Sequence, residues 1–175
     1  MAAYVLVHGA WQGAWGWARL KKSLEERGQR VLAVDLPGHG ERIQADLAKI
    51  ALQDYIDTVT EEIVKDDLHD VVLVGHSLDG ITVPYVAERI SERIKRLVFI
   101  SCLLPDEGKS ALETLGPLDR FLYKLIAGLT PARRRGARLP ALLARRKFCN
   151  DMDRETTKPK TGRCDRQSSG GCSAG

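Results

Sequence analysis

The stretch VVLVGHSLDG, residues 71–80, decides the fold and directs attention to one serine. Its first half, Val71–Gly75, is a continuous apolar run, which is typical of a strand buried on both faces of a parallel sheet. A helical pattern begins near Leu78, so Ser77 is expected on a sharp turn between strand and helix. The stretch nearly matches G-x-S-x-G, with Asp79 in place of the second glycine. The sequence therefore predicts a serine hydroxyl presented at the end of a buried strand.

Three further apolar runs and two further helical patterns surround this stretch. None of the runs alternates apolar with polar residues, so each fits a strand that is buried on both faces. The predicted strands are Tyr4–Val7, Val31–Asp35 and Arg96–Ser101, and the predicted helices are Trp15–Arg27, Leu52–Lys65 and a third that begins near Leu78 and contains Pro84. This alternation predicts right-handed crossovers and an α/β fold with a parallel sheet.

A serine hydroxyl becomes a useful nucleophile only with a base, an acid that orients the base, and N–H donors for the oxyanion. When the serine lies on a strand-to-helix turn, one donor comes from the residue after it and another from the loop after an earlier strand. We therefore expect the backbone N–H groups of Leu78 and Ala10 to form an oxyanion hole for Ser77. Ala10 belongs to the loop HGAW, in which Gly9 allows a tight turn.

The order of these motifs resembles the α/β-hydrolase superfamily, and most closely its methylesterase/hydroxynitrile-lyase-like group with its bacterial esterase relatives. The resemblance rests on YVLVHGAWQGAWGW, DLPGHGER, VVLVGHSLDG and RLVFISCLLPDEGKS, and it extends from Tyr4 to about Thr157. It implies a partial hydrolase core over residues 1–104 and a helical, lid-like segment over 105–157. Residues 158–175 form a polar tail without hydrophobic periodicity, which is predicted to be disordered.

The resemblance also implies an acyl-enzyme mechanism on a small ester or similar carbonyl substrate. It assigns Ser77 as the catalytic nucleophile and the N–H groups of Ala10 and Leu78 as oxyanion donors. His8 and His39 are expected to be structural loop residues, and the side chain of His76 is expected to point away from the serine. No cofactor-binding or metal-binding residue is predicted.

The chain departs from the pattern of this group in three places. Gln12 stands where many members have histidine, and Asp79 stands where they have glycine, which would place a negative charge beside the oxyanion. In this fold the acid and then the histidine follow the serine along the chain, but the four histidines here are His8, His39, His69 and His76. We therefore expect a truncated or frame-shifted hydrolase that lacks the catalytic acid and base. Its strand at 96–101 would form an unpaired, aggregation-prone edge.

Charge is distributed unevenly along the sequence. Residues 1–119 carry 13 Lys/Arg and 19 Asp/Glu, whereas residues 120–175 carry 14 and 4. We interpret the basic part as a solvated surface, with binding to nucleic acid or an anionic membrane as the alternative.

No run approaches the ~18 apolar residues of a membrane span, and the four cysteines fit no metal or redox spacing. A cytoplasmic protein that acts on a small molecule, without a nucleic-acid partner, is predicted. Its oligomeric state is open.

Two alternatives to an esterase remain at this stage. A lyase of the hydroxynitrile type would use the same serine, together with a histidine and a lysine from the part of the fold that is missing here. A non-catalytic binding protein would use the hydrolase pocket or the Arg-rich segment 130–148, TPARRRGARLPALLARRKF, which is interpreted as an amphipathic helix facing something acidic.

Overall fold

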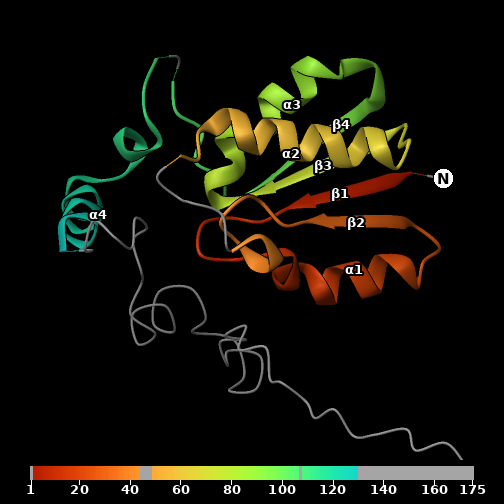
Figure 1. Ribbon diagram of the computed structural model, residues 1–175, viewed down its shortest axis with the longest axis horizontal. Helices are drawn as coiled ribbons and strands as arrows, with labels where there is room; N and C mark the ends of the chain where they lie inside the picture. The colour runs from red at the N-terminus through yellow and green to blue at the C-terminus, as the bar shows by residue number, and fades with distance from the viewer. Residues whose placement is uncertain (1, 44–48, 107, 130–175) are drawn as a thin grey trace, which may run out of the picture. The chain divides into compact units, whose positions relative to one another are not determined.

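The computed structural model describes residues 2–43, 49–106 and 108–129, all within the compact unit Met1–Arg138. Their centre is a four-stranded sheet in the order β2-β1-β3-β4, in which every neighbouring pair is parallel (Figure 1). The strands are β1 (Ala3–Val7), β2 (Arg30–Val34), β3 (Val71–His76) and β4 (Ile94–Ile100). All four coincide with the apolar runs of the sequence, so the predicted parallel α/β fold is confirmed.

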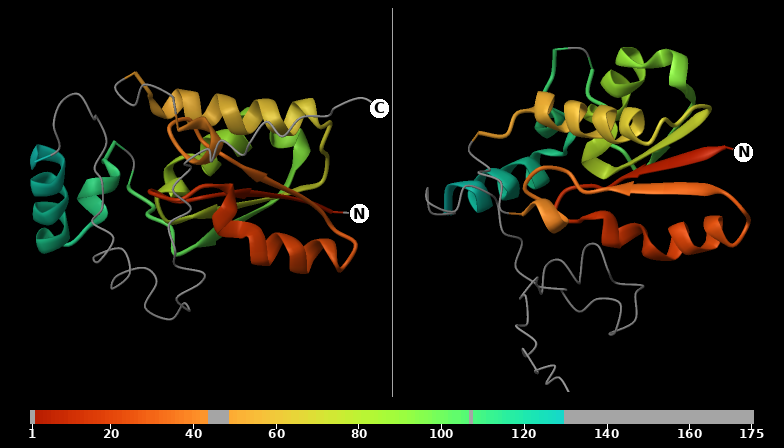
Figure 2. Two further views of the ribbon diagram at one scale, coloured as in Figure 1. Left: turned by 60° about the horizontal axis from the view of Figure 1, so that its bottom comes forward. Right: turned by 45° about the vertical axis from the view of Figure 1, so that its right-hand side comes forward.

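Helices cover both faces of this sheet (Figures 1 and 2). Helix α1 (Ala18–Glu25), preceded by the 3-10 turn η1 (Ala14–Trp17), lies on one face, and α2 (Leu52–Lys65) and α3 (Val83–Arg89) lie on the other. Pro84 lies in the first turn of α3, where the missing N–H group costs nothing because that group has no partner inside the helix. Short 3-10 turns, η2 (Gly40–Arg42) and η4 (Ser91–Arg93), complete the connections.

The apolar runs form two hydrophobic cores, one on each face. Successive strand side chains point to opposite faces. Thus Leu73 of β3 packs in the core under α2 and α3, whereas Val72 and Val74 pack in the core beside α1. Helix α2 contributes one stripe to the first core, namely Ile56, Val59 and Ile63. Each such side chain stabilises the fold by about 1.5–3 kcal/mol through its burial, which is why a continuous apolar run, and not an alternating one, marks these strands.

The two edges of the sheet differ in their exposure. On β2, the Nζ of Lys21 donates a hydrogen bond to the carbonyl of Val31 at 3.0 Å, which satisfies one polar group of that edge. On β4, which pairs only with β3 among the described residues, Val98, Phe99 and Ile100 are 37%, 40% and 38% exposed. The prediction of an exposed apolar edge at this strand is therefore confirmed for the described part of the chain.

After β4 the described chain contains the 3-10 turn η5 (Ala111–Thr114) and helix α4 (Pro117–Leu129). At the start of η5, the N–H and hydroxyl groups of Ser110 donate to Glu113 Oε2 at 2.6 and 2.8 Å. The first part of the predicted lid segment is thus helical. The rest of that segment, its basic stretch 130–148 and the predicted tail 158–175 lie outside the described residues, so the domain limits at 104 and 157 stay predictions.

Candidate active site

Ser77 lies on a strained turn at the junction of β3 and the 3-10 turn η3 (Ser77–Ile81). Its φ angle is +56°, a left-handed conformation that costs a non-glycine residue roughly 1–3 kcal/mol and occurs mainly where function requires it. The N-cap position of η3 belongs to His76, so the alternative role of Ser77 as a helix cap is not observed. A backbone hydrogen bond stabilises the turn, because the N–H of Leu103 donates to the Ser77 carbonyl at 2.7 Å.

Gly75 and Gly80 permit the packing of this turn. A Cβ atom on Gly75 would lie 3.1 Å from both methyl groups of Val83, the first residue of α3. A Cβ atom on Gly80 would lie 2.1 Å from the carbonyl oxygen of Leu103, which no side chain could accommodate. The glycine displaced by one place in GHSLDG is therefore required by the backbone that follows β4.

The loop after β1 approaches Ser77 directly. A Cβ atom on Gly9 would lie 2.7 Å from the Cβ of Ser77 and 3.0 Å from the carbonyl oxygen of His76. The loop turns sharply there, since Gln12 N donates to the Gly9 carbonyl at 3.3 Å and Trp11 has a φ of +60°. Ala10 follows this contact in sequence. The structure thus brings together the two segments that were predicted to contribute N–H donors, although these two segments are 68 positions apart at Gly9 and Ser77.

His8 fixes this loop to the loop after β2. It is buried, its Nε2 accepts a hydrogen bond from Leu36 N at 3.2 Å, and its Nδ1 lies 2.9 Å from the Gly9 carbonyl. This pair of contacts specifies the neutral tautomer with the proton on Nδ1. Burial lowers the pKa of His8 to about 4, and the neighbouring His39, whose ring centroid lies 5.0 Å away, adds to that decrease. His8 is therefore a structural residue, as the sequence indicated.

Asp35, directly after β2, provides a second link that the sequence analysis did not single out. Its Oδ1 accepts a hydrogen bond from Ala14 N at 2.6 Å, and its Oδ2 accepts one from Glu41 N at 3.1 Å. A Cβ atom on Gly40 would coincide with this carboxylate, and the φ of Gly40 is +51°. The acidic residue in DLPGHGE therefore holds the loops after β1 and β2 together beside the serine.

None of the four histidines makes a hydrogen bond to Ser77. The Nδ1 of His76 contacts Gln12 Oε1 at 3.2 Å, and that of His39 contacts the Pro37 carbonyl at 3.1 Å. His69 lies at the surface with Asp67 and Arg93. Gln12, which stands where many relatives were expected to have histidine, is thus a partner of His76.

The geometry of this site agrees with the comparisons with known proteins. A sequence profile described as the alpha/beta hydrolase family matches residues 4–172, nearly the whole chain. The chain belongs to the alpha/beta hydrolase family. This assignment explains the parallel sheet, the serine at the end of β3 and the glycine loop that touches it.

Individual relatives place this chain in the methylesterase and hydroxynitrile-lyase group. It is 37% identical over 142 residues to methylesterase 9 of Arabidopsis thaliana, a match that covers 77% of this chain and 50% of that protein. It is 38% identical over 108 residues to the alpha-hydroxynitrile lyase of the same plant, covering 59% of this chain and 40% of that one. The chain therefore spans half the length, or less, of these curated relatives.

Among solved structures, an extracellular alpha/beta-hydrolase from a Paenibacillus species superimposes with a TM-score of 0.79. The two are 25% identical, and the match covers 90% of this chain and 63% of the other. Among the described residues, no helix is long and apolar enough to cross a membrane, and no group of His, Cys, Asp and Glu side chains is arranged to hold a metal ion.

Asp79 is the departure from the expected motif with the largest physical consequence. Its side chain is 2% exposed, and its Oδ2 has no hydrogen-bond partner within the described structure. Burial raises the pKa of Asp79 to about 8, and the Oγ1 of Thr82 is likewise without a hydrogen-bond partner within the described structure. The charged form is disfavoured because the site offers too few donors to replace water. The sequence analysis expected a negative charge here, but at neutral pH the group is predominantly the uncharged acid.

Proposed function

We propose that Ser77 is the nucleophile of an ester-hydrolysing site in which the N–H groups of Ala10 and Leu78 stabilise the oxyanion. Ser77 Oγ would form a bond to the carbonyl carbon of a small ester while its proton passes to a base. The tetrahedral intermediate would then expel the alcohol, and water would release the acid from the acyl-enzyme. No cofactor or metal takes part in these steps.

The contact between Gly9 and Ser77 is the observation that carries this proposal. It puts the loop containing Ala10 against the serine, and a left-handed φ at Ser77 presents the hydroxyl at the end of a rigid parallel strand. The first N–H groups of a helical turn have no partner inside that turn, so Leu78 N–H is available to a developing negative charge. Both donors are backbone groups, which the fold fixes in advance.

The base is the missing part of this site. His8 has both ring nitrogens engaged, and the other three histidines contact groups other than Ser77. We propose that the chain by itself lacks the acid and histidine of the triad, so that only oxyanion stabilisation and substrate binding remain. Loss of a triad base in serine hydrolases generally leaves roughly 10³–10⁴-fold catalysis over water.

Chemical rescue with imidazole tests this proposal. We expect the purified chain to be acetylated slowly by p-nitrophenyl acetate, and added imidazole to increase the rate of Ser77 acetylation because it substitutes for the absent base. Mass spectrometry of the intact protein and of its peptides would locate the acetyl group. Imidazole also cleaves the ester in solution, so the Ser77→Ala variant provides the background rate.

Three outcomes distinguish a serine site without a base, a complete serine site and a non-catalytic chain. Acetylation of Ser77 that depends on imidazole supports the proposal. Fast turnover without imidazole that Ser77→Ala abolishes would show that the chain already contains a base. Equal rates for the two proteins under all conditions would make the chain a non-catalytic remnant of the fold.

A lyase is the second candidate, because the hydroxynitrile lyase of Arabidopsis thaliana is as similar to this chain as the methylesterase is. Release of benzaldehyde from mandelonitrile, compared between the chain and Ser77→Ala, separates lyase from esterase activity. A cytoplasmic location stays a prediction from the cysteine pattern.

A further inference from the structure

A hydrogen bond joins the loop after β1 to the last residue of β3. The Nδ1 of His76 lies 3.2 Å from the Oε1 of Gln12, although the two residues are 64 positions apart in the sequence. An amide oxygen accepts hydrogen bonds and cannot donate them, so His76 carries a proton on Nδ1 and donates it to Gln12. Burial lowers the pKa of His76, so its ring is neutral at pH 7 and the bond specifies one of the two neutral tautomers.

The imidazole ring of His76 meets the same segment at two further points. A Cβ atom on Gly9 would lie 3.0 Å from the Nδ1 of His76, so the backbone of the loop approaches the ring closely. Trp17, in the turn η1 that follows the loop, lies nearly perpendicular to the ring, with the two ring centroids 6.0 Å apart. His76 therefore connects the end of β3 to the start, the middle and the end of the segment after β1.

Both partners of this hydrogen bond are neighbours of the proposed reacting groups. Gln12 lies two residues after Ala10, and His76 directly precedes Ser77. We propose that Gln12 is a positioning residue for the oxyanion site. Its hydrogen bond with His76 fixes the distance between the N–H of Ala10 and the serine. This inference rests on the proposed function and adds to it a side chain that takes no direct part in the reaction.

The backbone of this loop needs such an anchor. Trp11 has a φ of +60°, and the hydrogen bond from Gln12 N to the Gly9 carbonyl is 3.3 Å long, compared with about 2.9–3.0 Å for most N–H···O bonds. An oxyanion donor acts only when it is held within about 2.7–3.1 Å of the developing charge. Loss of the acceptor on Gln12 would leave the Nδ1–H of His76 without that partner and the loop without its side-chain anchor.

A double-mutant cycle tests the coupling between the two side chains. Methionine is nearly as long as glutamine but lacks the amide oxygen, so Gln12→Met should reduce the imidazole-dependent acetylation of Ser77 about tenfold. The loss is smaller than the roughly 10²–10³-fold that follows removal of an oxyanion donor, because the donor is displaced and not removed. His76→Phe keeps an aromatic ring without the donor and should have a similar effect, and the double variant should lose no more than either single variant. Gln53→Met, at an exposed glutamine of α2, is the matched control and should leave the rate unchanged.

Nuclear magnetic resonance reports this hydrogen bond independently of the reaction. Long-range ¹H–¹⁵N spectra distinguish the two neutral tautomers of histidine, and the signals that disappear in His76→Phe belong to His76. We expect the Nδ1–H form in the unmodified chain and a population of the Nε2–H form in Gln12→Met. The tautomer in the unmodified chain tests the hydrogen bond even where a variant fails to fold, which circular dichroism would detect.

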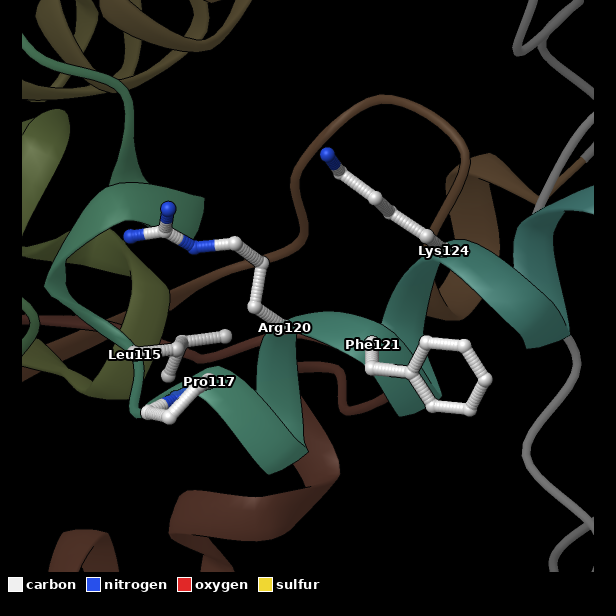
Figure 3. A pocket seen from close by; sticks show the side chains of 5 residues that line it. All are labelled: Leu115, Pro117, Arg120, Phe121 and Lys124. Atoms are coloured by element: carbon white, nitrogen blue, oxygen red, sulfur yellow. The ribbon is translucent and has the colours of Figure 1, made fainter.

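An exposed lysine provides an internal reference, because p-nitrophenyl acetate also acetylates free amines. Lys124 of α4 is exposed and belongs neither to the loop after β1 nor to the turn at Ser77. It extends beside a shallow hollow of about 440 Å³, whose other lining residues are Leu115, Pro117, Arg120 and Phe121 (Figure 3). Acetylation of Lys124 should therefore be equal in all variants, and the rate at Ser77 is expressed relative to it.

The outcomes separate this inference from the proposed function. A loss of Ser77 acetylation in Gln12→Met that the double variant does not increase, together with the change of tautomer, supports the positioning role. Unchanged acetylation, additive losses, or an Nε2–H form of His76 in the unmodified chain would overturn it and leave the proposed nucleophile intact. Absence of Ser77 acetylation in the unmodified chain, while Lys124 is acetylated, would overturn the proposed function and this inference with it.

Discussion

At the scale of the residue, the effect of Asp79 on the proposed oxyanion site depends on whether its carboxyl group is protonated. Asp79 lies two positions after Ser77. Burial raises the pKa values of Tyr55 and Cys102, and the negative charge of ionised Asp79 adds to both increases. As a neutral acid it adds no charge to the proposed oxyanion site, whereas its ionised form would oppose the developing negative charge there. Its protonation state therefore links the stability of the turn to pH.

Replacement of Asp79 by asparagine should reveal this link. The pKa of Asp79 is raised from 3.8 to about 8, so the folded state binds the proton more tightly than the unfolded chain. Between these two values, the free energy of unfolding should fall with rising pH by on the order of 1 kcal/mol per pH unit relative to Asp79→Asn. The difference should level off above about pH 8. Urea unfolding of both proteins from pH 5 to pH 9 measures it.

The comparison with Asp79→Asn is necessary because His8 acts in the opposite direction. Its pKa is lowered to about 4 by burial, so its contribution favours the folded state increasingly as pH rises from about 4 to 6.5. His8 is present in both proteins, so its effect cancels in the difference. A difference in unfolding free energy that does not change with pH would show that Asp79 is ionised throughout.

Gly9 is a second residue at which a single substitution should have a large effect, here on both the stability of the fold and the reactivity of Ser77. In Gly9→Ala the new Cβ would meet Ser77 Cβ at 2.7 Å, so the loop after β1 or the nucleophile turn must shift. We expect a loss of about 1–3 kcal/mol in unfolding free energy, as for other overpacked sites, and loss of the imidazole-dependent acetylation of Ser77.

Gly116→Ala is the matched control for this substitution, because a Cβ there meets nothing within 4 Å. It should leave both the unfolding free energy and the acetylation rate almost unchanged. If Gly9→Ala is equally harmless, the loop containing Ala10 does not lie against the serine.

At the scale of the element, strand β4 is the edge of the described sheet at which we expect self-association. An exposed strand edge presents unpaired N–H and C=O groups, and apolar side chains beside them promote association with other strands. Edge β2 has a lysine hydrogen bond that covers part of it, whereas β4 has three exposed apolar residues in succession. Self-association should therefore begin at β4.

A charge on this edge should suppress that association. We expect Val98→Lys to reduce light scattering of concentrated solutions severalfold, because an ammonium group cannot be buried between strands without a partner. Val64→Lys on α2, where the replaced side chain is also exposed, adds the same charge away from the edge and should have little effect. Equal suppression by the two variants would attribute the effect to net charge instead of strand pairing.

At the scale of the whole molecule, a chain that spans about half the length of its relatives forms a parallel sheet that is covered on both faces. The chain spans 50% of methylesterase 9 and 40% of the hydroxynitrile lyase, and yet β1 and β3 are fully enclosed in the two cores. The four strands and the loops that follow β1, β2 and β3 are the part of the fold that carries the serine, the glycine loop and their supports.

The fold could be predicted to a large extent because its signals are local. The run Val71–Gly75 contains no polar side chain, and such runs are typical of short strands that are buried on both faces. The helix Leu52–Lys65 begins and ends as its periodicity predicts, because one apolar stripe must meet the sheet. The structural role of Asp35 was harder to find, since it depends on a hydrogen bond from Ala14, which lies 21 positions away in the sequence.

The sequence by itself determined the family, the position of Ser77 and the absence of any histidine after His76, because motif order and composition are properties of the chain alone. Only the tertiary structure decided the state of Asp79 and the closeness of Gly9 to the serine. Ionisation depends on the water and donors that surround a carboxylate, and contact between distant loops depends on which strands become neighbours in the sheet. Neither the raised pKa of Asp79 nor the contact between Gly9 and Ser77 exists until the chain has folded.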